Sequence, residues 1–144
     1  IREVNEDEYE QLMSLYCQLH ETRVPEYKGD TKELWQRLVS NPDYHLIAAE
    51  EDGKIVSTCT CIIVPNMTHG PRPYAFVENV VTDSEYRGRG LATACLERAK
   101  EIAKAENCYR LILMTSSKLD STLNFYRKAG YDDKEKTGFI QYLD

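Results

Sequence analysis

The order of apolar and polar segments predicts a mixed α/β fold, in which a central sheet is flanked by about four helices. Two apolar runs, residues 44–51 and 54–64, flank Asp52-Gly53, which is a strong two-residue hairpin signal. Further on, an amphipathic segment at 91–106 separates two more apolar runs, as a covering helix between two strands does. With 144 residues the chain suits one domain, residues 1–144.

The N-terminal part predicts a short strand at residues 1–4 and two helices. The first helix is expected over 5–23, with apolar residues at helical spacing: Tyr9, Leu12, Met13, Tyr16 and Leu19. The second begins at Asp30 as N-cap, with Glu33 three residues later, and ends before Pro42. Its apolar stripe is Leu34, Trp35 and Leu38.

The remaining elements follow from the same patterns. We expect a strand at 74–82, the helix at 91–106, and a buried strand at 109–115. A short helix at 119–129 should end at Gly130 as its C-cap glycine. The run Gly138 to Leu143 predicts a closing strand.

Composition narrows the classes of protein and partner. The net charge of −6 and the pI of about 5.1 argue against nucleic acid as a partner. No stretch reaches the ~18 apolar residues of a membrane span. The five scattered cysteines, without a secretory signal, predict reduced thiols in a cytoplasmic protein. Cys59 and Cys61 share one face of a strand and are expected to be small core residues, so no metal site is predicted.

The stretch from Arg87 to Gly90 lies between the strand 74–82 and the helix 91–106. A helix N-terminus exposes unpaired N–H groups, glycines let the backbone approach an anion, and arginines add donors that suit phosphate. These residues predict a site that holds a phosphate group. The alternative is a tight strand-to-helix turn with glycine for tightness and arginine for solubility. A dinucleotide fingerprint is excluded, because Thr93 stands where the third glycine belongs.

Two motifs extend this interpretation. Arg87-Gly88-Arg89-Gly90-Leu91-Ala92 matches Arg/Gln-x-x-Gly-x-Gly/Ala, and residues 123–131 resemble Asn-Phe-Tyr-x-x-x-Gly-Phe/Tyr. With these motifs and its element order, the chain resembles the GNAT superfamily of N-acyltransferases. The resemblance implies a single-domain GNAT fold with a mixed, mostly antiparallel central sheet. It also implies acetyl-CoA as cosubstrate and transfer of its acetyl group to a primary amine.

The resemblance also implies roles for individual residues. The backbone of Val80, Val81 and Thr82 would pair with the pantetheine arm of the cofactor. Tyr126 would lie near the cofactor sulfur, and Asn124 would contact the pantetheine or shape that end of the site. The pyrophosphate would be held by N–H groups of Arg87, Gly88, Arg89, Gly90, Leu91, Ala92 and Thr93.

Transfer of an acetyl group to an amine needs an oxyanion contact, an acid for the leaving thiolate and a base for the amine. We expect the N–H of Val81 to supply the first and Tyr126 the second. Glu78 is the candidate base, either exposed at an edge or aimed into a cleft. A covalent route through Cys95 or Cys108 is the alternative; neither has a histidine nearby in sequence, so direct attack is preferred.

The three histidines, which are expected on the surface or in loops before any role as a base, are His20, His45 and His69.

The acceptor is left open among several classes. Residues 77–90, 108–113 and 124–131 are similar to the branch that acetylates glucosamine 6-phosphate, but Asn79 and Met114-Thr115 stand where that branch has acidic residues. The expected acceptor is a small-molecule amine. The loops at 20–30 and 66–74 carry residues that could meet an anionic acceptor: Arg23, Lys28, His69 and Arg72. The acidic N-terminal helix could equally favour a polyamine or a lysine peptide.

Two further functions stay open, a protein or peptide N-acetyltransferase and a non-catalytic acyl-CoA-binding module. The resemblance also allows a homodimer, because members of the family often pair through their C-terminal strands.

Overall fold

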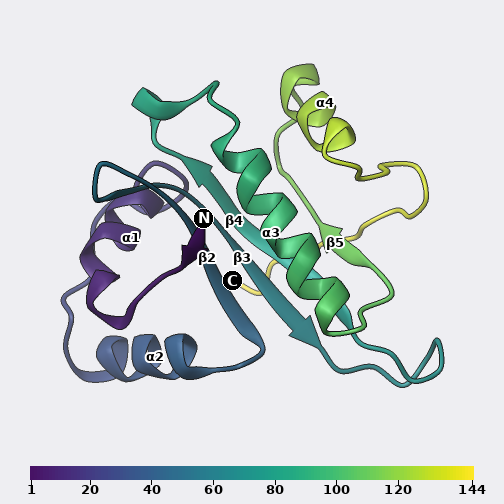
Figure 1. Ribbon diagram of the computed structural model, residues 1–144, viewed down its shortest axis with the longest axis horizontal. Coiled ribbons are helices and arrows are strands. Elements are labelled where there is room, and N and C mark those ends of the chain that lie inside the picture. The colour runs from purple at the N-terminus through teal and green to yellow at the C-terminus, as the bar shows by residue number, and fades with distance from the viewer. The chain divides into compact units, whose positions relative to one another are not determined.

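The computed structural model describes residues 1–144 and divides into two compact units, Ile1–Leu113 and Met114–Asp144. Figure 1 shows the helices and strands along the chain. The first unit contains β1 (Arg2–Glu3), the 3-10 turn η1 (Glu6–Glu8), α1 (Tyr9–Tyr16), α2 (Gly29–Ser40), β2 (Tyr44–Glu51), β3 (Lys54–Val64), β4 (Tyr74–Thr82), the 3-10 turn η2 (Ser84–Tyr86), α3 (Leu91–Ala105) and β5 (Leu111–Leu113). The second unit contains α4 (Asp120–Lys128).

The first unit is built on a five-stranded sheet in the order β1-β2-β3-β4-β5. All neighbours are antiparallel except β4 and β5, which are parallel. Asp52 and Gly53 both have positive φ, 53° and 76°, as the turn of a tight hairpin requires. The predicted α/β class, with a mixed, mostly antiparallel sheet and four α-helices, is confirmed.

The sheet has a different helical cover on each face. Cys59 and Cys61 lie on the face that α3 covers, along strands β3 and β4 in Figure 1, and their thiols approach the carbonyls of Cys95 and Ala99. Both are fully buried, so their prediction as core residues is confirmed. The opposite face packs against α1 and α2 in a core of nine residues: Val4, Tyr9, Leu12, Leu15, Trp35, Leu46, Ala48, Ile55 and Val81.

A β-bulge interrupts β4. Thr60 pairs with Glu78 but Thr58 pairs with Val81, so β4 has one extra residue at this point, and Asn79 takes a positive φ of 53°. Side chains alternate between faces along a strand, so the extra residue reverses the alternation. Val77 therefore faces α3, whereas Val81 joins the core on the other face.

Four expectations for the first unit are wrong in detail. The buried strand expected at 109–115 is only Leu111–Leu113 and is half-buried, because it lies at the edge of the sheet. The first helix is an α-helix only to Tyr16, because turns follow from Cys17 instead of a further helical segment. The second starts at Gly29, so Asp30 lies in its first turn and is not the N-cap. Trp35 is buried as expected, but Leu34 is 45% exposed, since only one side of this helix meets the core.

The second unit confirms one local prediction and overturns another. Gly130 has a φ of 101°, and the N–H groups of Gly130 and Tyr131 donate to Arg127 and Tyr126 carbonyls, a Schellman cap for α4. The predicted closing strand at 138–143 does not form, and its apolar residues are exposed, with Phe139 and Leu143 both at 90%. Alternation predicts which side chains a strand would present, but a strand also needs a neighbouring backbone to bond.

No helix is long and apolar enough to cross a membrane.

Candidate active site

β4 has an open edge next to the bulge. Strand β5 pairs with it only from Ala75 to Val77, and no strand pairs with residues 78–82 on that side. The backbone N–H and C=O groups that face this side are not paired with any strand, so the edge can accept another extended chain as a β-partner. The expected pantetheine residues Val80, Val81 and Thr82 all lie in this stretch.

The direction of the peptide groups on this edge follows from two side-chain contacts. Ser57 Oγ donates to the Val81 carbonyl at 3.4 Å, so this carbonyl faces β3. Arg87 Nε donates to the Thr82 carbonyl at 3.2 Å, on the opposite edge. Because the N–H and C=O of a strand residue point the same way and alternate along the chain, the groups of Val80 and Thr82 face the open edge.

The segment after β4 turns sharply into α3. Gly88 and Gly90 both have a φ of 78°, and a Cβ at either position would meet no atom within 4 Å. The glycines are therefore required for the left-handed backbone rather than for close packing. The first helical hydrogen bond runs from Ala94 to Gly90, and no side chain caps the helix. The N–H groups of residues 91–93 thus have no partner within the helix. We call residues 87–93 the cradle.

The two arginines of the cradle are held differently. Arg89 Nη1 donates to Glu51 Oε2 at 3.0 Å, and its guanidinium lies over the ring of Tyr86, 4.8 Å from the centroid. Arg87 uses only Nε, in its bond to Thr82. Its two terminal nitrogens, which can bind a phosphate in a fork, are not engaged.

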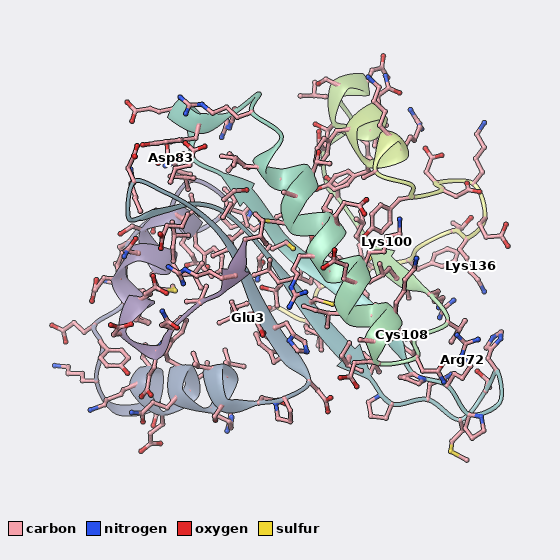
Figure 2. The ribbon with its side chains drawn as sticks, viewed as in Figure 1. Glu3, Arg72, Asp83, Lys100, Cys108 and Lys136 are labelled. Atoms are coloured by element: carbon pink, nitrogen blue, oxygen red, sulfur yellow. The ribbon has the colours of Figure 1, made fainter.

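Asp83 anchors the entry to the cradle (labelled in Figure 2). It is only 7% exposed, its Oδ1 accepts from the N–H of Glu85, and Lys54 lies 3.3 Å from Oδ2. The hydrogen bond from Glu85 and the charge of Lys54 lower the pKa of Asp83. The N–H of Ser84 donates to Gln18 at 2.9 Å. Asp83 and these contacts, which the motif does not contain, tie the cradle to the turn after α1 and to the β2–β3 hairpin.

Glu78 is exposed and lies on the α1 face, directly across from Thr60. Tyr44 is a near neighbour: burial raises the pKa of Tyr44, and the charge of Glu78 raises it further. Tyr16, from the last turn of α1, packs on the same core, and burial raises its pKa to about 12 despite the opposing effect of Thr60. Both phenols therefore stay neutral at physiological pH.

Thr60 is fully buried, and its Oγ1 makes no hydrogen bond of good geometry. Thr60, Tyr16 and Tyr44 thus form a hydroxyl-bearing group beside Glu78, which we call the hydroxyl cluster. Sequence reasoning missed it, although one signal was available: Ser57, Thr58 and Thr60 place polar residues in a buried strand. A buried hydroxyl without a partner is unusual in a structural core.

The cysteines do not suit a covalent mechanism. Cys95 is fully buried, and burial raises its pKa to about 11. Cys108 is half-buried, and burial raises its pKa as well. A thiol with a raised pKa is a poor nucleophile, because the thiolate is the reactive form. No cluster of histidine, cysteine and acidic residues could hold a metal ion.

The remaining candidates are the three histidines of the first unit and two residues of the second unit. His20 is exposed, His45 bonds Glu3 at 2.7 Å, and His69 stacks on Tyr109. In the second unit, Asn124 is exposed and accepts from Arg127 at 2.8 Å. Tyr126 is half-buried on α4, with its ring 5.1 Å from Phe125 and 6.4 Å from Tyr131.

A strand with an open edge thus leads through a glycine turn into an uncapped helix, an arrangement that can accept an extended ligand along the strand and an anion at the helix N-terminus. The family model of the acetyltransferase (GNAT) family matches residues 9–131. The chain therefore belongs to the GNAT family.

Individual relatives cover different shares of their own length. A glucosamine 6-phosphate N-acetyltransferase of Trypanosoma brucei brucei is 38% identical over 84 residues, 58% of this chain and 55% of that protein. An acetyltransferase of Photorhabdus laumondii is 28% identical over 143 residues, 97% of this chain and 91% of that one. The chain thus spans little more than half of the Trypanosoma protein.

A solved structure extends the likeness to the whole chain. It is a candidate acetyltransferase of Agrobacterium tumefaciens strain C58, with 34% identity and a TM-score of 0.88. The match covers 99% of this chain and 98% of that one.

Proposed function

We propose that residues 1–144 act as one GNAT domain that transfers the acetyl group of acetyl-CoA to a primary amine of a small molecule. The observation that carries the proposal is the open edge of β4 at residues 78–82, which leads directly into the uncapped cradle. An extended pantetheine arm on that edge would bring the pyrophosphate to the amides of residues 87–93, in agreement with family membership. The arm would pair with Val80 and Thr82, and the family motif assigns Asn124 to the pantetheine as well.

The reaction proceeds by direct attack. The amine nitrogen forms a bond to the thioester carbonyl carbon, and the C–S bond then breaks as the tetrahedral intermediate collapses. We assign the oxyanion contact to the N–H of Val80 rather than to that of Val81, because the Val81 carbonyl faces Ser57 and β3. Such a fixed donor contributes about 3 kcal/mol to the stability of the transition state.

Two proton transfers complete the step. Glu78 accepts a proton from the acceptor, which enters as an ammonium ion and must become a neutral amine before it attacks. Its exposure and its place beside the bulge support this role. Tyr126 donates a proton to the leaving thiolate, as the family motif implies, and the tyrosinate regains a proton as the nitrogen loses its second proton on forming the amide. The hydroxyl cluster would hold the amine-bearing end of the acceptor, with Thr60 Oγ1 gaining the hydrogen bond that it lacks.

The acceptor class rests on relatives and on this cluster. The name of the Trypanosoma relative specifies an amino-sugar phosphate. Buried hydroxyls beside a carboxylate suit a small polar amine better than a peptide chain, which would need a longer groove. A non-catalytic acyl-CoA-binding module would not need Glu78 or Tyr126.

The test combines binding and turnover. Thiol release from acetyl-CoA is followed across amino sugars, their phosphates, amino acids, polyamines and lysine peptides. Glu78→Gln and Tyr126→Phe should each lower kcat by roughly 100-fold or more while the Kd for acetyl-CoA stays unchanged. Matched controls are Glu33→Gln and Tyr142→Phe, which alter exposed residues outside the proposed site.

Turnover with a small amine and loss of kcat in both variants would support the enzyme. Binding of acetyl-CoA without turnover of any amine, or turnover that both variants retain, would contradict the proposed chemistry.

A further inference from the structure

Arg110, at the start of β5, is a cation without an acidic partner. Its Nε is buried and makes no hydrogen bond, and no carboxylate forms an ion pair with it. Its guanidinium instead lies over two rings, 5.1 Å from the centroids of Tyr74 and Tyr109. Since a buried donor without a partner has lost its hydration with no hydrogen bond in return, this arrangement needs an explanation.

A second arginine reaches the same segment. Arg72 donates from Nε to the carbonyl of Asn107 and from Nη2 to that of Cys108, at 3.1 and 3.2 Å. Both acceptors are neutral, so the charge of Arg72 is not compensated either. Figure 2 shows Arg72 and Cys108 together, at the end of the sheet opposite Asp83. Two uncompensated cations in a chain with a net charge of −6 mark a local preference for an anion.

The loop that carries Arg72 is structurally fixed. The side-chain amide of Asn66 donates to both oxygens of Thr68 and to the carbonyl of Arg72, and the N–H of Arg72 donates back to Thr68. His69, in the same loop, stacks on Tyr109 with 3.9 Å between centroids and 21° between planes. The cations are therefore held in place before any ligand binds, which lowers the entropy cost of binding.

Arg110 belongs to the sheet face that also carries Glu78. Directly paired residues of neighbouring strands share a face, and the register pairs Ile62 with Phe76 and Phe76 with Ile112. Glu78 and Tyr74 lie two residues to either side of Phe76 and so share this face. Arg110, two residues before Ile112 and over the ring of Tyr74, is on it too.

The separation of the two charges fits a small molecule. Glu78 and Tyr74 are four strand residues apart, about 13 Å between backbone positions, and the glutamate and arginine side chains shorten this gap. Between them lie the half-buried side chains of Ile62 and Phe76. The face thus presents a carboxylate at one end, an apolar floor, and a guanidinium at the other end.

We propose that Arg110, supported by Arg72, binds an acidic group of the acceptor, so that the acceptor is a primary amine that also carries a phosphate or carboxylate. The inference rests on the proposed function for the placement of the amine at Glu78. The acidic group forms charge-assisted hydrogen bonds with the guanidinium, and its oxygens satisfy the buried Nε. The same donors recognise phosphate and carboxylate. The two groups are distinguished by comparing amines that carry a phosphate with amines that carry a carboxylate.

The test compares acidic amines with their neutral parents: glucosamine 6-phosphate with glucosamine, phosphoethanolamine with ethanolamine, and 6-aminohexanoate with hexylamine. Arg110→Met should raise KM for the acidic member at least tenfold, leave its kcat within about threefold, and leave the neutral parent unchanged. Arg110→Lys should recover part of the loss. Arg98→Met, an exposed arginine on α3, is the matched control, and melting curves confirm that each variant folds.

A binding measurement separates this inference from the proposed function. Inorganic phosphate is titrated calorimetrically into protein saturated with CoA, so that the cradle is already filled. Wild type should bind phosphate and Arg110→Met should bind it at least tenfold more weakly, even if no amine is acetylated.

Three results would overturn the inference. The first is equal binding of phosphate by both proteins, and the second is a KM that rises equally for acidic and neutral amines. The third is inhibition by phosphate that is not competitive with the acceptor, which would indicate a separate effector site.

Discussion

Arg89 Nη1 donates to Glu51 Oε2 at 3.0 Å, and this bond ties the glycine turn of the cradle to the end of β2. The guanidinium of Arg89 also lies over the ring of Tyr86. The Nζ of Lys54 lies over the same ring, 5.7 Å from its centroid. Arg89 thus has protein partners for its charge, while Arg87, two residues earlier, keeps both terminal nitrogens unengaged. The two arginines of one motif therefore have different roles.

Arg87→Met should weaken acetyl-CoA binding about tenfold or more, because charge-assisted bonds to phosphate contribute roughly 1.5–3 kcal/mol. Arg89→Met should weaken it less and should lower the melting temperature instead. Calorimetric Kd values and melting curves for both variants separate the two effects. An equal loss of affinity in both variants would show that Glu51 releases Arg89 to the cofactor.

Gly88→Ala and Gly90→Ala should each lower stability by about 1–2 kcal/mol, because φ at both positions is 78° and an L-residue is strained there. They should also weaken acetyl-CoA binding, since relief of the strain moves the amides of the cradle. Gly29→Ala is the control, with a φ of 56° outside the cradle. The Gly29→Ala variant should be less stable but should keep the wild-type Kd for acetyl-CoA. Unchanged affinity in all three variants would contradict the proposal that the cradle binds acetyl-CoA.

Asn79 should tolerate glycine but not valine, because its φ of 53° is the bulge conformation. Asn79→Val should lower the free energy of unfolding by about 1–2 kcal/mol or straighten β4. Either change moves the Val80 N–H, so kcat should fall more than the Kd for acetyl-CoA rises. Urea unfolding and steady-state kinetics measure the two effects, and full activity of Asn79→Val would argue against an oxyanion contact at Val80.

Asp83 should make stability depend on acid pH. Its pKa in the folded protein is lowered below the ordinary value of 3.8, so its contribution is full above that value and is lost as pH falls through the folded pKa. At pH 6, Asp83→Asn should be less stable than wild type by about 1 kcal/mol. As the pH falls through the lowered pKa of Asp83, the difference should close.

Urea unfolding between pH 6 and pH 2.5 measures this difference for Asp83→Asn. Glu85→Gln, at an exposed position of the same turn, is the control and should show a small, constant difference from wild type. If the difference in the free energy of unfolding between wild type and Asp83→Asn stays constant with pH, the charge of Asp83 does not stabilise the turn.

Cys95→Ala should keep kcat within about twofold, because the burial that raises the pKa of Cys95 to about 11 leaves almost no thiolate at neutral pH. A thiol reagent applied to the native protein should react at most with Cys17 and Cys108, which are the two cysteines that are not fully buried. When the protein is incubated with acetyl-CoA and then quenched with acid, mass spectrometry should find no acetylated cysteine. An acetyl group on Cys95 would overturn direct attack.

Local backbone conformation could be predicted from the sequence where only a few residue types suit the conformation. Asp52-Gly53 identified the hairpin, Gly130 identified the end of α4, and Arg87 to Ala92 identified the cradle. In each case the conformation depends on backbone torsions within a few residues. Such torsions are favoured by the residues themselves, whatever they pack against.

Features that depend on contacts between distant segments could not be predicted from the sequence. The strand predicted at 138–143 does not form, since alternation alone cannot supply a neighbouring backbone. The hydroxyl cluster brings together Tyr16, Tyr44 and Thr60 from three elements, and Glu51 meets Arg89 across 38 residues of chain. No local pattern encodes these meetings.

By itself, then, the sequence determined the α/β class, the core role of Cys59 and Cys61, and the motif of the GNAT family. Only the tertiary structure decided that the bulge at Asn79 turns Val81 into the core and leaves the peptide groups of Val80 and Thr82 at an open edge. The reason is that strand register is set by the packing of both sheet faces at once. The extra residue in β4 can be recognised only when the pairing of β4 with β3 is known.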